Sequence, residues 1–158
     1  MSKDSLTLFE TARGMHQAGQ LEAAATHYTE LLALEPDYPH ASYLYAVTLL
    51  SLNRADEALP AIQAHLKQRM EHVPGWVTLG DCYARQGKIP EAAAAYQEAL
   101  RFETKNLDAA LGLGQLLVTE ERWKALSQFA DPILQLNPTC LPALGLKVRA
   151  LDGMQDYK

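Results

Sequence analysis

The chain of 158 residues has only two cysteines and no long hydrophobic run. No apolar stretch approaches the roughly 18 residues of a membrane span, and the first residues lack the apolar core of a signal peptide. The cysteines, Cys82 and Cys140, are far from the CxxC spacing of a metal or redox motif, so we expect buried or idle thiols. These absences favour a protein of the reducing cytoplasm that has no membrane partner.

A strongly basic surface is also lacking. The sequence has 14 basic against 19 acidic residues, a net charge of −5, and like charges do not gather in long runs. Nucleic acid binding depends on basic side chains that displace the counterions of the phosphates. The charge balance therefore argues against a nucleic acid partner.

Groups of side chains that could carry out catalysis or hold a cofactor are missing as well. The five histidines are scattered, and none has a second histidine or a cysteine three or four residues away: His16, His27, His40, His65 and His72. Because a helical metal site needs such spacing, we expect no metal ligands, mostly solvated histidines, and a buried, hydrogen-bonded exception at His65. Gly112 and Gly114 lie inside a helical pattern and not in a phosphate-binding loop. The sequence thus predicts a protein that is not an enzyme and has no cofactor.

What the sequence does contain is a pair of helical patterns between residues 73 and 106. The first pattern places large apolar and small residues at helical spacing: Trp76, Leu79, Gly80 and Tyr83. The second pattern does the same: Ala92, Tyr96 and Ala99. Gly87 stands where a left-handed residue would end a helix, and Pro90 stands in a first turn that needs no donor. We therefore expect helices over 74–86 and 90–103, packed as an antiparallel hairpin in which Gly80 faces Ala92 and Ala99.

These spacings resemble the tetratricopeptide repeat, a 34-residue helix-turn-helix unit. The agreement covers eight positions: Trp76, Leu79, Gly80, Tyr83, Gly87, Ala92, Tyr96 and Ala99. Thr104 departs from the pattern, because the family usually has proline there. Steps of 34 residues stay in register and divide the chain into repeats 5–38, 39–72, 73–106 and 107–140 and a partial repeat 141–158. The resemblance implies one all-α array over residues 1–158, a right-handed α-solenoid of four stacked antiparallel helix pairs plus one terminal helix.

Two prolines fall inside the expected second helices of their repeats. An interior proline removes a backbone hydrogen bond and clashes with the preceding turn. We expect a slight kink or a late helix start near Pro60, and a break or a sharp bend over 129–132 at Pro132.

The partial repeat is expected to form a helix over 142–153. Its apolar residues that would cover the fourth repeat are Leu144, Val148 and Leu151. Leu146, Met154 and Tyr157 would then stay partly exposed. An apolar end of this kind suggests either a fragment of a longer protein or pairing with a second copy.

The first helix of each repeat lines a concave face in the tetratricopeptide repeat family. The resemblance implies a groove there for a protein or peptide partner. The side chains expected to line it come from four repeats: Phe9, Arg13, Tyr43, Leu44, Val47, Val77, Thr78, Asp81, Arg85, Leu111 and Gln115.

Within this groove we expect an apolar pocket of Phe9, Tyr43 and Val47. Its rim is expected to be polar: Arg13, Asp81 and Arg85. Aromatic anchors with a polar tip are common at binding centres, so Tyr43 is expected to be exposed. For Leu44 the sequence leaves two interpretations open: exposure in the groove, or packing against the neighbouring helix.

One subfamily binds the C-terminal carboxylate of chaperones through two lysines, two asparagines and an arginine. The matching positions of this chain hold Phe9, Arg13, Leu44, Pro74 and Thr78. A window shifted by one repeat holds Tyr43, Val47, Thr78, Asp108 and Gly112. Neither set supplies the paired cations that a carboxylate needs, so we expect no such clamp.

The leading hypothesis is a non-catalytic protein–protein interaction module that binds a peptide or a helix of its partner in the concave groove. One alternative is the N-terminal recognition arm of a larger enzyme, of the transferase or hydroxylase type, whose catalytic domain follows Lys158. Another is a structural scaffold that forms homodimers through the terminal helix.

Overall fold

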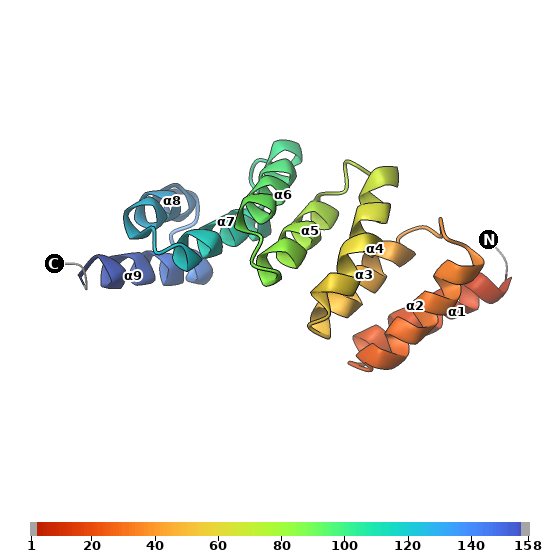
Figure 1. Ribbon diagram of the computed structural model, residues 1–158. Helices are drawn as coiled ribbons and strands as arrows, with labels where there is room; N and C mark the ends of the chain where they lie inside the picture. Colours follow the sequence, from red (N-terminus) through yellow and green to blue (C-terminus); the bar gives the residue numbers. More distant parts are fainter. Residues whose placement is uncertain (1–2, 156–158) are drawn as a thin grey trace.

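The computed structural model describes residues 3–155, without the side chains of Lys3 and Leu136. Over these residues the chain forms only helices and short connections (Figure 1). They are α1 (Lys3–Gln17), α2 (Leu21–Leu34), α3 (Ala41–Ser51), α4 (Ala55–Gln68), α5 (Val73–Arg85), α6 (Ile89–Phe102), α7 (Leu107–Thr119), α8 (Trp123–Leu136) and α9 (Leu141–Gln155). Between residues 3 and 155, no helix has both the length and the apolar character needed to span a membrane.

A residue with positive φ follows the first helix of each of the four pairs. These residues are Gly19, Asn53, Gly87 and Glu121, with φ of 76°, 60°, 72° and 55°. After each of them the chain closes a turn, as where the Lys88 N–H donates to the Tyr83 carbonyl at 3.0 Å. This is the usual way to end a helix, because the left-handed residue lets the next N–H reach back to a free carbonyl. These four turns follow one another at intervals of 34 residues.

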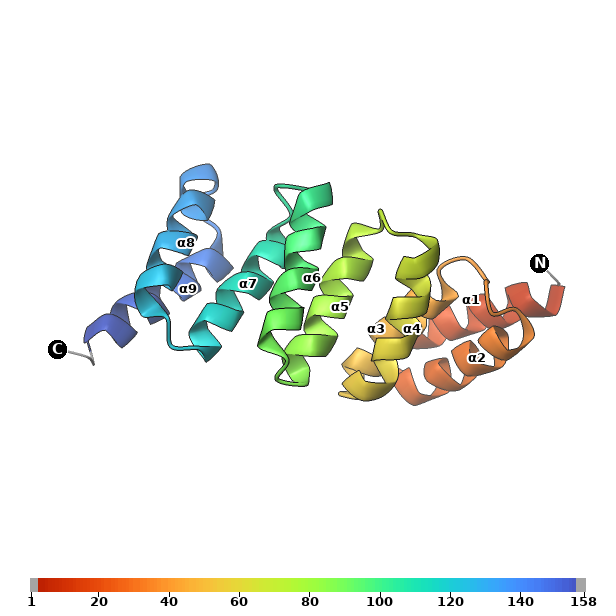
Figure 2. The same ribbon diagram turned by 45° about the horizontal axis from the view of Figure 1, so that its top comes forward.

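The helices form two layers. Each odd-numbered helix contacts the next odd-numbered one, from α1 to α9, whereas the described residues show no such contact between even-numbered helices. Helices that approach each other more closely lie on the inner side of a curved stack, so the odd-numbered helices form the concave layer. Figure 2 shows the layers along the elongated array, whose termini lie at opposite ends.

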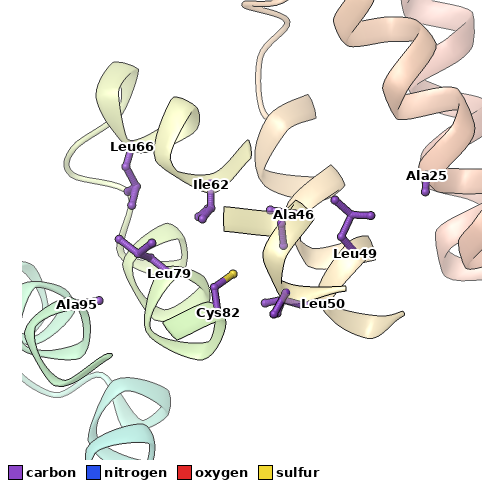
Figure 3. Close-up of a cluster of buried hydrophobic side chains, with 11 residues drawn as sticks. Ala25, Ala46, Leu49, Leu50, Ile62, Leu66, Leu79, Cys82 and Ala95 are labelled. Carbon is purple, nitrogen blue, oxygen red and sulfur yellow. The ribbon is translucent and has the colours of Figure 1, made fainter. Parts of the chain in front are cut away.

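The hydrophobic core runs between neighbouring pairs instead of filling a central ball. One cluster draws on α2, α3, α4, α5 and α6 (Figure 3): Ala25, Ala46, Leu49, Leu50, Ala55, Ala58, Ile62, Leu66, Leu79, Cys82 and Ala95. Burying a side chain such as Leu49 or Ile62 stabilises the fold by roughly 1.5–3 kcal/mol. Because each pair supplies only part of such a cluster, a repeat depends on its neighbours. Cys82 and Cys140 are buried free thiols, as expected.

The expectations at the two prolines are partly wrong. The helix α4 begins at Ala55, five residues before Pro60, so the start is not late. The helix α8 runs from Trp123 to Leu136 without a break at Pro132. Both prolines are solvent-exposed, and so are Asp56 and Gln128, four residues before them. The carbonyls of Asp56 and Gln128, which receive no N–H from the prolines, therefore lie on the solvent-exposed side of each helix, where water can donate a hydrogen bond to them.

The expected orientation of the terminal helix is also wrong. In α9 the buried residues are Ala143, Leu146 and Ala150. Leu146 lies against α7, where a Cβ added to Gly114 would come within 2.5 Å of its Cδ1. The residues expected to be covered are exposed instead: Leu144, Val148 and Leu151, at 37%, 54% and 46%. Met154 is half-buried, and Tyr157 lies outside the described residues.

The physical reason lies in the two contact faces of a first helix. Positions equivalent to Leu144 and Val148 meet the second helix of the same pair, as Gly114 meets Phe129 of α8. Among the described residues no helix follows α9 to pack on this face. The face that meets the preceding pair is the one that α9 buries.

The nearest neighbour of Gly80 is an aromatic ring. A Cβ added to Gly80 would lie 2.5 Å from Cε1 of Tyr96, and one added to Gly112 would lie equally close to the same atom. The missing side chain thus makes room for the ring of Tyr96.

Candidate functional site

At the N-terminal end of the concave layer, Phe9 is half-buried and faces its own helix pair. Its ring centroid lies 5.0 Å from that of Tyr38 and 6.5 Å from that of Tyr28. Arg13 is exposed, and its Nη2 lies 2.5 Å from a carboxylate oxygen of Glu10. This end therefore offers the partly covered edge of an aromatic cluster and one ion pair in solvent.

The three candidate residues of α3 are all half-buried. The ring of Tyr43 meets that of His72 edge to face, with centroids 4.7 Å apart. Burial raises the pKa of Tyr43, and a hydrogen bond with Thr78 lowers it to a smaller extent. The expected exposure of Tyr43 is therefore only partial. Leu44 packs against the cluster of Ala12, Ala24 and Tyr28, so its side chain supports the neighbouring helix, while Val47 remains half-buried.

The side chains of Thr78 and Arg85 on α5 already bond within the array. Val77 is half-buried, and buried Thr78 donates to the Pro74 carbonyl at 2.8 Å. Arg85, expected on the polar rim, uses one Nη1 to donate to the Leu50 carbonyl at 3.0 Å and to Oδ1 of Asn53 at 3.1 Å. Arg85 therefore caps the C-terminal end of α3 from the next repeat.

Asp81, also expected on the rim, is half-buried as well. One carboxylate oxygen accepts a hydrogen bond of 2.6 Å from the hydroxyl of Tyr96. Burial raises the pKa of Asp81, while this hydrogen bond and the charge of Arg85 lower it. The Asp81 carboxylate is thus hydrogen-bonded to another side chain of the array.

At the C-terminal end, Leu111 and Gln115 of α7 line an open hollow of about 250 Å³ against α9. Its remaining walls come from the terminal helix: Pro142, Gly145, Leu146 and Arg149. The guanidinium of Arg149 reaches Gln115 Oε1 at 3.5 Å across the opening. The hollow combines apolar walls with a cation at its edge, which suits an apolar side chain flanked by a polar group.

The structure also gathers three histidines that were expected to be scattered. One nitrogen atom of each of His40, His65 and His72 lies within 4.8 Å of the other two. His65 is 2% exposed, and its Nε2 lies 2.9 Å from Nδ1 of His72. The buried, hydrogen-bonded state expected of His65 is confirmed, whereas the expected separation of the histidines is wrong. Burial lowers the pKa of His65 to about 4, helped by His72 and His40.

Sequence reasoning predicted Leu111 and Gln115 but missed the α9 wall of the hollow and the meeting of the three histidines. The α9 wall was overlooked because the face of the terminal helix was assigned the wrong way round. For the histidines, a signal was present in the repeat register: His40 precedes a first helix, and His65 lies near the end of the second helix of the same pair. An antiparallel hairpin brings these two ends together, but a search for ligands three or four residues apart does not detect such a pair.

Comparison with known proteins points to one family. Two family models, both described as tetratricopeptide repeat, match residues 15–79 and 73–106. The chain is 30% identical over 122 residues to the Hsp70-Hsp90 organizing protein of Triticum aestivum, covering 75% of this chain and 21% of that protein. The chain spans about a quarter of the length of the curated relatives that it matches.

Solved structures share the fold. The part of MamA from Desulfovibrio magneticus RS-1 that begins at residue 41 superposes with a TM-score of 0.81 at 20% identity, covering 87% of this chain and 77% of that one. The second TPR domain of the human RPAP3 protein, in complex with an HSP70 peptide, gives 0.68 at 19% identity, covering 71% and 93%. With these folds, the matching family models and the four equivalent turns, the chain belongs to the tetratricopeptide repeat family, as an all-α, right-handed solenoid.

Proposed function

We propose that this chain is a non-catalytic protein-interaction module that binds a peptide segment of a partner on its concave layer. The observation that carries the proposal is the open hollow between α7 and α9, where Leu111 and Gln115 meet Gly145 and Arg149. An apolar side chain of the peptide would enter the hollow, and Arg149 would bind a carbonyl or a carboxylate beside it.

The middle of the layer would guide the peptide more than anchor it. Tyr43, Val47 and Val77 are half-buried and offer partial apolar surface, whereas Asp81 and Arg85 already bond within the array. We therefore place the energetic centre of binding near the α7–α9 hollow and not at the pocket expected from Phe9, Tyr43 and Val47.

The known relatives support the class of function. One curated relative is named for organizing Hsp70 and Hsp90, and a solved neighbour holds an HSP70 peptide. For this chain we propose a different ligand chemistry, because Phe9, Leu44 and Pro74 stand where the chaperone clamp needs polar and cationic side chains. The same proposal assigns a scaffold role in the cytoplasm, where two free buried thiols fit a reducing environment.

The test selects peptides from a random phage-displayed library on the purified chain and measures their affinity by calorimetry. Gly145 lines the hollow, so the side chain of Gly145→Leu would occupy it. No clash is expected, since a Cβ at Gly145 meets no atom within 4 Å. We expect it to weaken binding more than about tenfold. Gly14→Leu on α1 is the matched control, because a Cβ there also meets nothing, and it should bind like the parent. Equal binding by both variants would disprove the assignment of the hollow.

A second measurement separates this site from the chaperone clamp. The HSP90 peptide SRMEEVD, which is bound by a solved neighbour, should bind this chain with a Kd weaker than about 1 mM, because the paired cations are lacking. Tight binding that depends on the terminal carboxylate would mean that the proposed ligand chemistry is wrong.

A second role is favoured by the exposed face of α9. Leu144, Val148 and Leu151 are exposed, whereas Gly114 and Leu117, which are equivalent to Val148 and Leu151, pack against α8. We propose that a second copy of the chain covers this face. No comparison supports the alternative in which the array serves a transferase or a hydroxylase.

A further inference from the structure

Three imidazoles meet at the end of the second helix pair. His40 lies just before α3, His65 in the last turn of α4, and His72 just before α5. Their ring centroids are 4.7 Å apart for His65 and His72, 5.9 Å for His40 and His72, and 6.2 Å for His40 and His65. Three separate segments of the chain thus aim one type of metal-binding group at the same point.

The fold makes room for this meeting. The antiparallel packing of α3 and α4 places the start of one beside the end of the other, and the connection to α5 returns past both. Gly75, in the first turn of α5, is buried, and a Cβ added to it would lie 3.1 Å from Nδ1 of His72 and 3.4 Å from Cδ2 of His65. A larger residue at this position would press on the side chain of Leu66, 2.9 Å away, and on the two rings.

The spacing is close to that of metal ligands. Zinc–imidazole bonds of about 2.0–2.1 Å at tetrahedral angles put the nitrogen atoms about 3.3–3.4 Å apart. His65 and His72, at 2.9 Å, would have to separate by about half an ångström. The widest separation, within 4.8 Å, would have to close by about 1.4 Å at most. Small rotations of the side chains of His40 and His72 would bring about both changes in distance, since His40 is exposed and His72 is only half-buried.

We propose that His40, His65 and His72 form a binding site for one divalent transition-metal ion of the zinc class. Three imidazoles would occupy one face of a tetrahedron, and the exposed side of His40 leaves the fourth position to water. Imidazole nitrogen suits zinc, cobalt, nickel and copper, and it suits calcium and magnesium poorly.

The surroundings set the expected strength. Arg69 lies close enough for its charge to act on both His65 and His72, and it opposes any added cation. We therefore expect a Kd of about 1–10 μM, well above that of a structural zinc finger. The ring of Tyr43, with its centroid 5.5 Å from that of His65, covers one side of the site. A bound ion would join the second repeat to the start of the third.

Metal binding can be measured on the full chain after treatment with a chelator. Zinc is titrated by calorimetry at about pH 7.5, where unperturbed imidazoles are neutral, and cobalt is followed by its visible absorption. We expect one ion per chain and a thermal transition that rises with metal concentration. His40→Ala and His72→Ala should each weaken binding by at least about 100-fold, because loss of even an outer-shell partner costs 10–100-fold.

The matched control is His27→Ala on α2, whose ring contacts Glu30 and lies outside the cluster. It should bind zinc like the parent. Both test variants change residues that are not fully buried, and circular dichroism will establish that they remain folded. Binding that is not stoichiometric, or that His40→Ala leaves unchanged, would overturn the site and leave His65 and His72 as a hydrogen-bonded pair.

Discussion

The hydroxyl of Tyr96 on α6 donates a hydrogen bond of 2.6 Å to a carboxylate oxygen of Asp81 on α5. The ring behind this hydroxyl lies between Gly80 and Gly112, on α5 and α7. One tyrosine thus holds three helices from two repeats. Burial and the adjacent carboxylate both raise the pKa of Tyr96, so its hydroxyl keeps its proton and remains a donor.

The fit around this ring predicts that Gly112→Ala destabilises the array. The new Cβ would come within 2.5 Å of the ring, which the hydrogen bond and Gly80 prevent from moving away. We expect a loss of about 1–3 kcal/mol in the free energy of unfolding, measured with urea. Gly145→Ala is the control: its Cβ meets nothing within 4 Å, and it should stabilise α9 by about 0.5–1 kcal/mol. A neutral Gly112→Ala would mean that the ring has room to shift.

The burial of Asp81 predicts a pH dependence. Because its pKa is raised from 3.8, the folded protein binds this proton more tightly than the unfolded chain does. The contribution of Asp81 to stability is therefore greatest below pH 3.8 and falls as the pH rises through the raised pKa.

Asp81→Asn removes this titration and keeps an oxygen for Tyr96. Its stability relative to the parent should increase between about pH 3.5 and pH 7, as measured by urea unfolding at several pH values. Asp152 is exposed, so Asp152→Asn serves as the control for the general effect of removing a carboxylate. A relative stability that decreases over this range would contradict the prediction.

The left-handed turn at Gly87 predicts opposite results for one substitution at two sites. A Cβ at Gly87 or at Gly14 meets no atom within 4 Å, but Gly87 has a φ of +72° whereas Gly14 lies within α1. Gly87→Ala should cost about 1–2 kcal/mol, and Gly14→Ala should stabilise by about 0.5–1 kcal/mol. Thermal unfolding of the two variants measures the difference, and a shared sign would rule out the conformational explanation.

The exposed face of α9 predicts self-association. Val148→Glu combined with Leu151→Glu should convert a dimer to a monomer, because the charges would be buried without partners. Sedimentation equilibrium over a range of concentrations measures the change. Leu34→Glu on α2 is the control, since Leu34 is 62% exposed and lies far along the array. A parent chain that stays monomeric at every concentration would exclude this interface.

The sequence by itself determined the repeating unit of this protein, a pair of helices. Small residues recur at 34-residue steps at Ala12, Ala46, Gly80 and Gly114, and large ones at Tyr28, Ile62 and Tyr96. Gly19 and Gly87 end helices at equivalent positions. These signals are local, because helix periodicity and left-handed turns depend on residues only a few positions apart. The all-α fold and the repeating helix pair therefore follow from the order of the residues alone.

Tertiary structure alone decided which surfaces meet. The terminal helix has two apolar faces, and only the neighbouring helices select Leu146 for burial and leave Val148 in solvent. Likewise, His40 and His72 are brought together by the return of the chain, and Pro132 is tolerated because it faces water. Periodicity specifies that a helix has an apolar face, but the partner of that face is a contact between distant residues, which only the packed array establishes.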